Sequence, residues 1–202
     1  HMKQRKFLAT ILSVATVLSC ITYSALAVDS PSKGTFKLEP LTQEEVIQHL
    51  ADNNNISYFE AAQKYAEYQK SSPRVIEEFL FTYVENVGTR DCPCEIEVGA
   101  IVELNMVAGY REFVDIVPGT EYAQCISSGY VSYDCKSVSA DILNPQKIKF
   151  ITAGTAYVEI DVSEEAEFGA DLEVVGFSVS ETVGSTITYR KSVHITGYAG
   201  VN

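Results

Sequence analysis

The sequence predicts a mainly β protein: an antiparallel β-sandwich, jelly-roll or Ig-like, preceded by a short αα-hairpin. Three observations predict this fold. From residue 74 onward, apolar and polar residues alternate with a period of two, as in strands with one buried face. Turn signals separate these runs at short intervals. Between residues 41 and 73 the apolar period is instead that of helices. A β-barrel is the runner-up for the same strand pattern.

The first 27 residues predict a signal peptide. A basic stretch at residues 3–6 precedes an uncharged apolar run at 7–21, and small residues ending at Ala27 supply the A-x-A pattern of a cleavage site. His1-Met2 is interpreted as a remnant of cloning. One alternative is a membrane anchor, for which the apolar run is short. Another is lipid attachment at Cys20, which ends the lipobox-like stretch VLSC.

Residues 28–40 are polar and contain two prolines and a glycine, so they predict a linker. Two helices are predicted after it, at residues 41–73. Thr42 and Glu45 have capping-box spacing at the start of the first helix, and Ser57 and Glu60 repeat it before the second. The expected apolar sides are Val46, Ile47 and Leu50 in the first helix, and Phe59, Ala62 and Ala66 in the second. We expect the first side to pack on the sheet or on a second copy of the protein.

Strands are predicted throughout the β-sandwich domain, residues 74–202. The clearest is Glu95 to Val107, in which alternate residues from Ile96 to Met106 are apolar. Gly154 is expected to divide one long run into two strands. The predicted strands are Val75–Val87, Glu95–Val107, Tyr110–Val117, Glu121–Ser127, Tyr130–Leu143, Lys147–Thr152, Thr155–Val162, Leu172–Ser180 and Thr186–Thr196.

The charge of the chain limits its partners. The formal net charge is −12, and it becomes −15 after the first 27 residues are removed, because they contain three basic residues and no acidic ones. Nucleic acid is therefore disfavoured, since phosphate binding needs clustered Lys and Arg. Anionic membrane surfaces are disfavoured for the same reason. The absence of tryptophan weakens a carbohydrate-binding interpretation, although twelve tyrosines could stack on sugars.

Four cysteines follow the predicted signal peptide: Cys92, Cys94, Cys125 and Cys135. Thiols oxidise outside the cytosol, and four is an even number, so these cysteines predict two disulfides. We expect Cys92 and Cys94 to pair with Cys125 and Cys135, in either arrangement. The local alternative joins Cys92 to Cys94 in a strained, reducible ring and suggests a redox role. Zinc is disfavoured, because Cys-x-Cys is tighter than the usual ligand spacing.

No catalytic motif is found in the sequence, which lacks both G-x-S-x-G and H-E-x-x-H. His49 and His194 are interpreted as ordinary surface or structural residues. The acidic segment DVSEEAEFGAD, between two predicted strands, is a candidate for weak Ca²⁺ binding, although a solvated loop is preferred because EF-hand spacing is missing. Its candidate ligands are Asp161, Glu164, Glu165, Glu167 and Asp171.

The segment GFSVSETVGSTITYRKSVHI, Gly176 to Ile195, resembles the C-terminal hairpin of small exported proteins of Gram-positive bacteria that carry no assigned function. The order of a signal peptide, EEVIQHLADNNNISYFEAAQ helices and a β domain ending in VGSTxxYRK is similar too. The resemblance implies an architecture and no activity.

Together these observations predict an exported, non-enzymatic protein that acts by binding or assembly at or outside the cell surface. Its partner is expected to be a protein, a glycan or a second copy of the chain, and no stable transmembrane segment remains after cleavage. Two alternatives stay open. One is an extracellular hydrolase that uses carboxylates. The other is a pore-forming, toxin-like protein that inserts the alternating stretch Val179 to Tyr189 as a β-hairpin.

Overall fold

The computed structural model describes residues 34–71, 77–107, 110–127 and 129–201, without the side chains of residues 71, 107 and 165–167. The predicted signal peptide and residues 28–33 of the predicted linker lie outside these residues. The elements are β1 (Thr35–Pro40), α1 (Gln43–Asn54), α2 (Tyr58–Ser71), β2 (Glu77–Asn86), β3 (Glu95–Val107), β4 (Tyr110–Ile116), β5 (Tyr122–Cys125), β6 (Val131–Asn144), β7 (Lys147–Asp161), α3 (Glu165–Val174), β8 (Ser178–Val183) and β9 (Thr186–Gly200). In the described part of the chain, no helix combines the length and apolar character needed to cross a bilayer.

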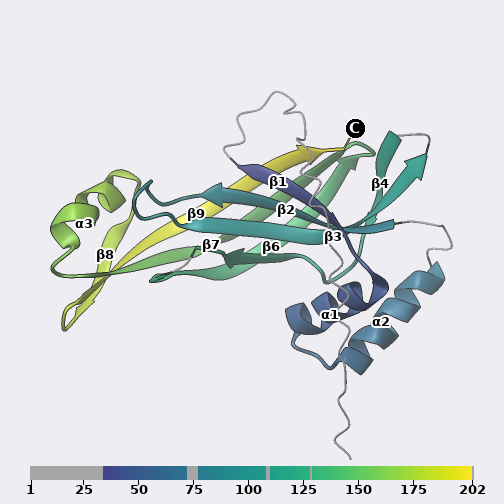
Figure 1. Cartoon of the computed structure of the whole chain (residues 1–202), viewed down its shortest axis with the longest axis horizontal. Coiled ribbons are helices and arrows are strands. Elements are labelled where there is room, and N and C mark those ends of the chain that lie inside the picture. Colours follow the sequence, from purple (N-terminus) through teal and green to yellow (C-terminus); the bar gives the residue numbers. More distant parts are fainter. Residues whose placement is uncertain (1–33, 72–76, 108–109, 128, 202) are drawn as a thin grey trace, which may run out of the picture.

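The strands form two antiparallel sheets, and the predicted β-sandwich is confirmed (Figure 1). Sheet A has the order β1-β2-β3-β4, and β5 shares with β4 the outer edge of β3. Sheet B has the order β6-β7-β9-β8. Because sheet A uses only β1–β5 and sheet B only β6–β9, this strand order is more local than that of an Ig or jelly-roll fold.

The main core lies between the two sheets. Alternate residues of β3, from Ile96 to Leu104, face Phe150, Tyr189 and their neighbours in sheet B. Phe81 of β2 contributes an edge-on aromatic contact with Phe150, with 5.7 Å between ring centroids. The predicted alternation of β3 is therefore confirmed as the core-facing row of sheet A.

A second core lies on the outer face of sheet A, where the helical hairpin packs. Val46, Ile47 and Leu50 of α1 are buried there against Ile101 and Val117. The expectation that this apolar side packs on the sheet is thus confirmed, and the molecule has three layers: hairpin, sheet A and sheet B. Figure 1 shows α1 and α2 beneath sheet A, while β8 and α3 lie at the opposite end of the molecule.

The predicted helix signals agree with the structure at the start of each helix. Thr42 and Glu45 form the complete capping box, with the Thr42 N–H 2.8 Å from Glu45 Oε2 and the Glu45 N–H 3.3 Å from Thr42 Oγ1. The Glu60 N–H likewise donates to Ser57 Oγ at 3.2 Å. Asn55, in the left-handed region with φ of 50°, ends α1.

The predicted apolar side of α2 is correct only at Ala62, which is half-buried and packs against the second core. Ala61 and Tyr65 are buried, whereas Phe59 is 72% exposed and Ala66 is also exposed. The buried residues are four positions apart, so they share a helix face, and Tyr68 continues it. Several apolar faces are available in this sequence, and the contact with sheet A selects one of them.

Three further predictions are corrected by sheet contacts. The C-terminal part of the predicted linker is β1, which pairs with β2 from Thr35 to Pro40 and places Phe36 4.8 Å from the Tyr83 ring. Gly154 does not break β7. It lies opposite β6, where a Cβ would be 2.3 Å from the Asp134 carbonyl oxygen, so glycine allows the close approach.

The third correction concerns the acidic segment. It is not a loop, because residues from Glu165 onward form α3, and the predicted strand from Leu172 begins only at Ser178. Leu172 and Phe177 are buried, and Phe168 packs against the main core. This burial accounts for a short helix where the sequence pattern predicted a loop and a strand.

Candidate functional site

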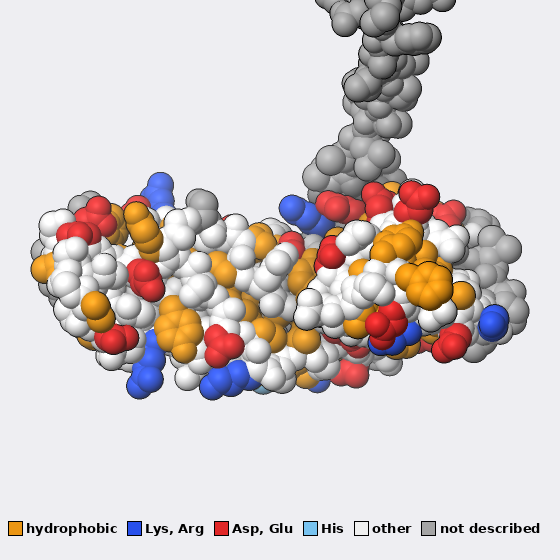
Figure 2. Space-filling model, turned by 90° about the horizontal axis from the view of Figure 1, so that it is seen from below, with side chains coloured by type: hydrophobic (Ala, Val, Ile, Leu, Met, Phe, Trp, Pro, Cys, Tyr) orange, Lys and Arg blue, Asp and Glu red, His pale blue; other side chains and the backbone are white. Residues whose placement is uncertain are grey.

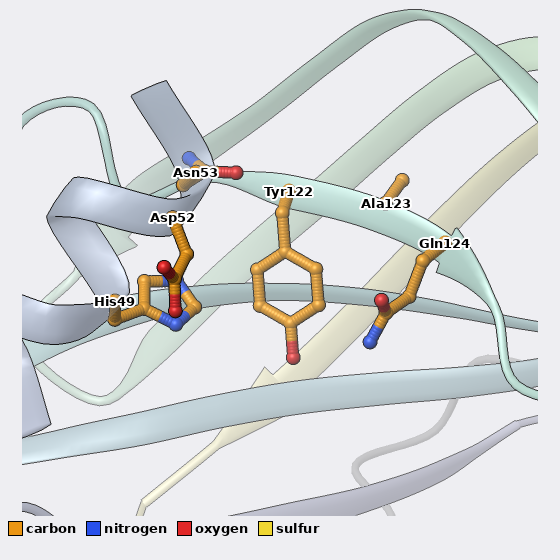
Figure 3. Close-up of a pocket in the computed structure, with 6 residues that line it drawn as sticks. All are labelled: His49, Asp52, Asn53, Tyr122, Ala123 and Gln124. Carbon is orange, nitrogen blue, oxygen red and sulfur yellow. The ribbon is translucent and has the colours of Figure 1, made fainter. Parts of the chain in front are cut away.

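A polar hollow of about 380 Å³ lies between the C-terminal half of α1 and β5 (Figure 3). The helix and the strand each contribute one side of it, and Figure 3 shows the Tyr122 ring between the side chains of the helix and Gln124. The lining residues are His49, Asp52 and Asn53 from α1 and Tyr122, Ala123 and Gln124 from β5. Its size is within the range of pockets that bind small ligands.

Tyr122 is positioned by a glycine on the neighbouring strand. β5 pairs with β3 so that Tyr122 lies opposite Gly99, and the ring covers that glycine. A Cβ at Gly99 would lie 2.5 Å from Tyr122 Cε1, so any side chain there would displace the ring. An aromatic residue over a strand glycine replaces the packing that the glycine lacks. Gly99 therefore leaves the space that the Tyr122 ring needs, and the ring forms one wall of the hollow.

The loop before β5 is held by the end of α1. The Asn53 amide donates to the Gly119 and Glu121 carbonyl oxygens at 2.8 and 3.0 Å, and the Asn54 amide donates to Gly119 O at 2.9 Å. Gly119 has φ of 79°, which favours glycine. Buried Thr120 donates to Val117 O at 2.6 Å and accepts from the Ile101 N–H at 3.0 Å. These bonds fix β5 relative to both the helix and β3.

His49 takes part in the same attachment. Its Nε2 lies 3.1 Å from the Thr120 carbonyl oxygen, and since a carbonyl only accepts, Nε2 carries the hydrogen. In the neutral ring Nδ1 is then the acceptor. The imidazole also meets the Tyr122 ring edge-on, with 5.1 Å between centroids. His49, interpreted from sequence as an ordinary residue, thus joins α1 to β5 and lines the hollow.

A carboxylate lies beside the Tyr122 hydroxyl. Glu97 Oε1 accepts from Tyr122 Oη at 2.8 Å and from Gln124 Nε2 at 3.1 Å. Burial raises the pKa of Tyr122, and the negative charge of Glu97 raises it further, so the hydroxyl keeps its proton. Asp52 brings a second carboxylate, which accepts from Gln48 Nε2 at 2.8 Å. The surroundings are acidic, as Figure 2 shows for the end of the molecule where the hairpin lies.

This arrangement suits binding. It presents an aromatic ring, an imidazole, two side-chain amides and a carboxylate to one open space, which together donate and accept hydrogen bonds in several directions. Its negative charges favour neutral or cationic ligands over anions. Sequence reasoning missed the hollow, because 71 positions separate His49 from Thr120 and no motif links the two segments.

The four predicted disulfide cysteines are unbonded in the structure. Cys94 is buried, and Cys92, Cys125 and Cys135 are half-buried. Burial raises the pKa of Cys94 to about 12, with further increases from the neighbouring Cys125 and Cys92 thiols, so these three lie together at one end of the main core. Cys135, in β6, contacts other groups: its thiol lies 3.5 Å from Ser137 O and 3.7 Å from Thr152 Oγ1.

The candidate Ca²⁺ ligands are not brought together where they are described. Asp161 Oδ1 accepts from the backbone N–H and the hydroxyl of Ser163, and these bonds lower the pKa of its carboxyl. Glu164 and Asp171 are exposed, and the side chains of Glu165 and Glu167 lie outside the described residues. Among described side chains, no group of three or more His, Cys, Asp or Glu is arranged to hold a metal ion.

The remaining sequence candidates lie in sheet B. His194 is exposed on β9 opposite Ala153, and no hydrogen bond joins it to a described serine or aspartate. The segment Val179 to Tyr189 forms the β8–β9 hairpin, in which all of β8 is exposed. β8 thus has no described layer over either face.

Comparison of the chain with protein-family models, curated proteins and solved structures finds no match. The resemblance to small exported proteins therefore remains a prediction that rests on the sequence segments themselves.

Proposed function

We propose that the protein is exported and works without catalysis, binding a neutral polyhydroxylated ligand of the glycan class at or outside the cell surface. The observation that carries this proposal is the hollow between α1 and β5. It combines the Tyr122 ring with the polar groups of Asp52, Asn53 and Gln124. Sugars are bound by such sets, in which an aromatic ring meets C–H groups while amides and carboxylates pair with hydroxyls.

The construction of the hollow supports binding because its main groups are already held in place. Tyr122 is fixed by Gly99 and Glu97, and the adjoining loop is fixed by Asn53 and His49. A ligand would therefore order few side chains on binding, which reduces the entropic cost. The carboxylates of Glu97 and Asp52 favour a ligand without negative charge.

The test uses the chain without residues 1–27 and a panel of neutral cello-, chito- and malto-oligosaccharides, with binding measured by calorimetry. We expect at least one series to bind, and Tyr122→Ala to weaken its affinity by about tenfold or more through loss of the ring contact. Tyr157→Ala is the matched control, because Tyr157 lies half-exposed on the outer face of β7, away from the hollow. Failure of every series to bind, or equal weakening by both variants, would overturn the proposal.

Two further measurements address the other parts of the proposal. Release of reducing ends from a bound oligosaccharide, lost in Asp52→Asn, would replace binding by hydrolysis as the function. Cell fractionation with N-terminal sequencing tests export. We expect the protein outside the cytoplasm with its chain starting at Val28, and a cytoplasmic chain that retains residues 1–27 would contradict export.

A further inference from the structure

Cys94 and Cys125 are neighbours on the core side of sheet A. β3 and β5 pair with Ile96 opposite Cys125, and the Ile126 N–H donates to Glu95 O at 2.9 Å. Cys94 precedes Ile96 by two positions, so it lies on the same face as Cys125 and one step along the neighbouring strand. Cys94 is fully buried in the main core, and half-buried Cys125 packs against that core.

The backbone around Cys92 and Cys94 is held by four hydrogen bonds. The Cys92 N–H donates to Thr89 Oγ1 at 2.8 Å, and Cys92 O accepts from the Thr89 N–H at 3.0 Å. The Cys94 N–H donates to Asn86 Oδ1 at 3.0 Å, and Cys94 O accepts from the Val87 N–H at 2.9 Å. Gly88 fits inside this loop because a Cβ there would be 2.4 Å from Cys92 O.

These contacts favour a Cys94–Cys125 bond over a Cys92–Cys94 bond, and the Cys92→Ser variant below tests the remaining Cys92–Cys125 pairing. A Cys92–Cys94 ring requires the backbone on both sides of Pro93 to bend, which would break several of these bonds. Joining Cys94 to Cys125 keeps these hydrogen bonds and needs side-chain rotation with an approach of the two paired strands, because diagonal neighbours lie farther apart than the Cβ atoms of a disulfide. We propose that Cys94 and Cys125 form a disulfide, and that this bond clamps the C-terminal end of β5 onto β3.

The reaction balances with a small-molecule disulfide such as oxidised glutathione. The Cys125 thiolate, on the more exposed of the two residues, attacks one glutathione sulfur, and the other glutathione leaves as a thiolate that takes up a proton. The Cys94 thiolate then attacks Cys125 Sγ and displaces the second glutathione. Two protein thiols are oxidised, and one glutathione disulfide is reduced to two thiols.

The Cys94–Cys125 bond would restrain a strand that lines the hollow. This part of the inference rests on the proposed function. β5 carries Tyr122 and Gln124, and its N-terminal end is already held by the bonds from α1. Its other end is Cys125. Oxidation would therefore add a covalent attachment at this end and hold the Tyr122 ring in place, whereas in the reduced chain only hydrogen bonds such as Ile126 N–H to Glu95 O hold it to β3.

Non-reducing peptide mapping of the full chain after glutathione oxidation tests the pairing. We expect a linked peptide that contains Cys94 and Cys125, retained in Cys92→Ser and in Cys135→Ser. The link should be lost in Cys125→Ser and in Cys94→Ala, and the first of these changes a half-buried residue that folding tolerates more readily. Loss of the link in Cys92→Ser, which would indicate a Cys92–Cys125 bond, would overturn the proposal. A Cys92–Cys94 or Cys125–Cys135 link in place of the expected one would also overturn it.

Two readouts of the clamp need no ligand. Oxidation should raise Tm by on the order of 10 °C, because the bond closes a loop of about thirty residues. It should also slow hydrogen exchange of the β5 amides by about tenfold, with β8 amides as the control. Unchanged β5 exchange in chains shown to carry the link would refute the clamp.

The oligosaccharide affinity of oxidised and reduced protein then separates the two proposals. Tighter binding by the oxidised form, by severalfold, supports both. If no oligosaccharide binds either form, the proposed function fails, while the mapped link and the slowed β5 exchange still establish the clamp.

Discussion

The central strands of the two sheets, β3 and β7, have similar sequence patterns but different surroundings. Along β7, buried residues alternate with half-exposed or exposed ones over the whole strand, as expected for a sheet with one face in water. Along β3, every residue from Val98 to Leu104 is buried. The difference arises because the helical hairpin covers the outer face of sheet A, while no described element covers that of sheet B.

The covered face buries polar groups as well as apolar ones. Glu103 is only 1% exposed, and the Tyr65 hydroxyl donates its one hydrogen to the Glu78 carboxylate, with its oxygen 2.7 and 2.8 Å from the two carboxylate oxygens. Buried polar groups need such partners. At the margin of this covered region, α1 stops short of β5 and leaves the hollow around Tyr122. The comparison teaches that a covering layer creates both a second core and, at its edge, the candidate binding site.

The largest expected effect comes from removing apolar volume beneath the hairpin. Ile101→Ala should destabilise the protein by about 3 kcal/mol, because Ile101 is fully buried between β3 and α1. Ile151→Ala is the matched change on the outer face of β7, where the side chain is half-exposed, and should cost about 1 kcal/mol. Urea denaturation midpoints measure both. Equal losses would show that the hairpin does not cover sheet A in solution.

A smaller effect is expected where the covered face meets the hollow. Gly99→Ala should destabilise by about 1–3 kcal/mol, because the new methyl group overlaps the Tyr122 ring. In the double variant Gly99→Ala/Tyr122→Ala the overlap is gone, so the loss should be less than the sum of the two single losses by about 1 kcal/mol. Strict additivity in denaturation measurements would mean that Tyr122 does not lie over Gly99.

The smallest effect is a pH dependence that only the covered face should show. Burial raises the pKa of Glu78, and this exceeds the lowering by Tyr65 and Gln69. The folded state therefore binds this proton more tightly than the unfolded state. Its contribution to stability is complete below the unfolded pKa of about 4.5 and is lost as pH rises through the folded pKa. Glu78→Gln should remove this fall in the free energy of unfolding, which urea denaturation between pH 4 and 7 measures.

Glu45 supplies a control of opposite sign for that measurement. Its pKa is lowered by the backbone and side-chain hydrogen bonds with Thr42. The capping box therefore contributes stability above the unfolded pKa and loses it as pH falls through the folded pKa. Glu45→Gln should weaken the protein at neutral pH and reduce the loss on acidification. A parallel response of both variants would contradict the assigned causes.

Much of the fold could be predicted from local patterns. The bounds of β3 agree at both ends, since alternation from Ile96 to Met106 is long and unambiguous. The capping box at Thr42 located the start of α1 because its two bonds lie within one turn of chain. Errors occurred where distant contacts outweigh local signals, as at β1, Gly154 and α3. The buried face of α2 was predicted only in part, since its sequence offers more than one apolar side.

The candidate site could not be predicted in the same way. Helix α2 and the three strands β2–β4 separate His49 and Asn53 from Thr120 and Gly119 in the chain, and no sequence spacing predicts their contact. Cys92-Pro93-Cys94 did mark its own segment as unusual. Only the β3–β5 register, however, places Cys94 on the same face as Cys125 and diagonal to it, which is the basis of the proposed pairing.

By itself, the sequence determined most of the secondary structure, the β-sandwich class and the acidic character of this protein. These follow from periodicity, capping and charge, which act between residues close in the chain or depend on composition alone. Tertiary structure decided which faces are buried, where the hairpin ends over sheet A, and which side chains line the hollow. These depend on contacts between segments tens of residues apart, and such contacts form where complementary surfaces exclude water, which no local pattern specifies.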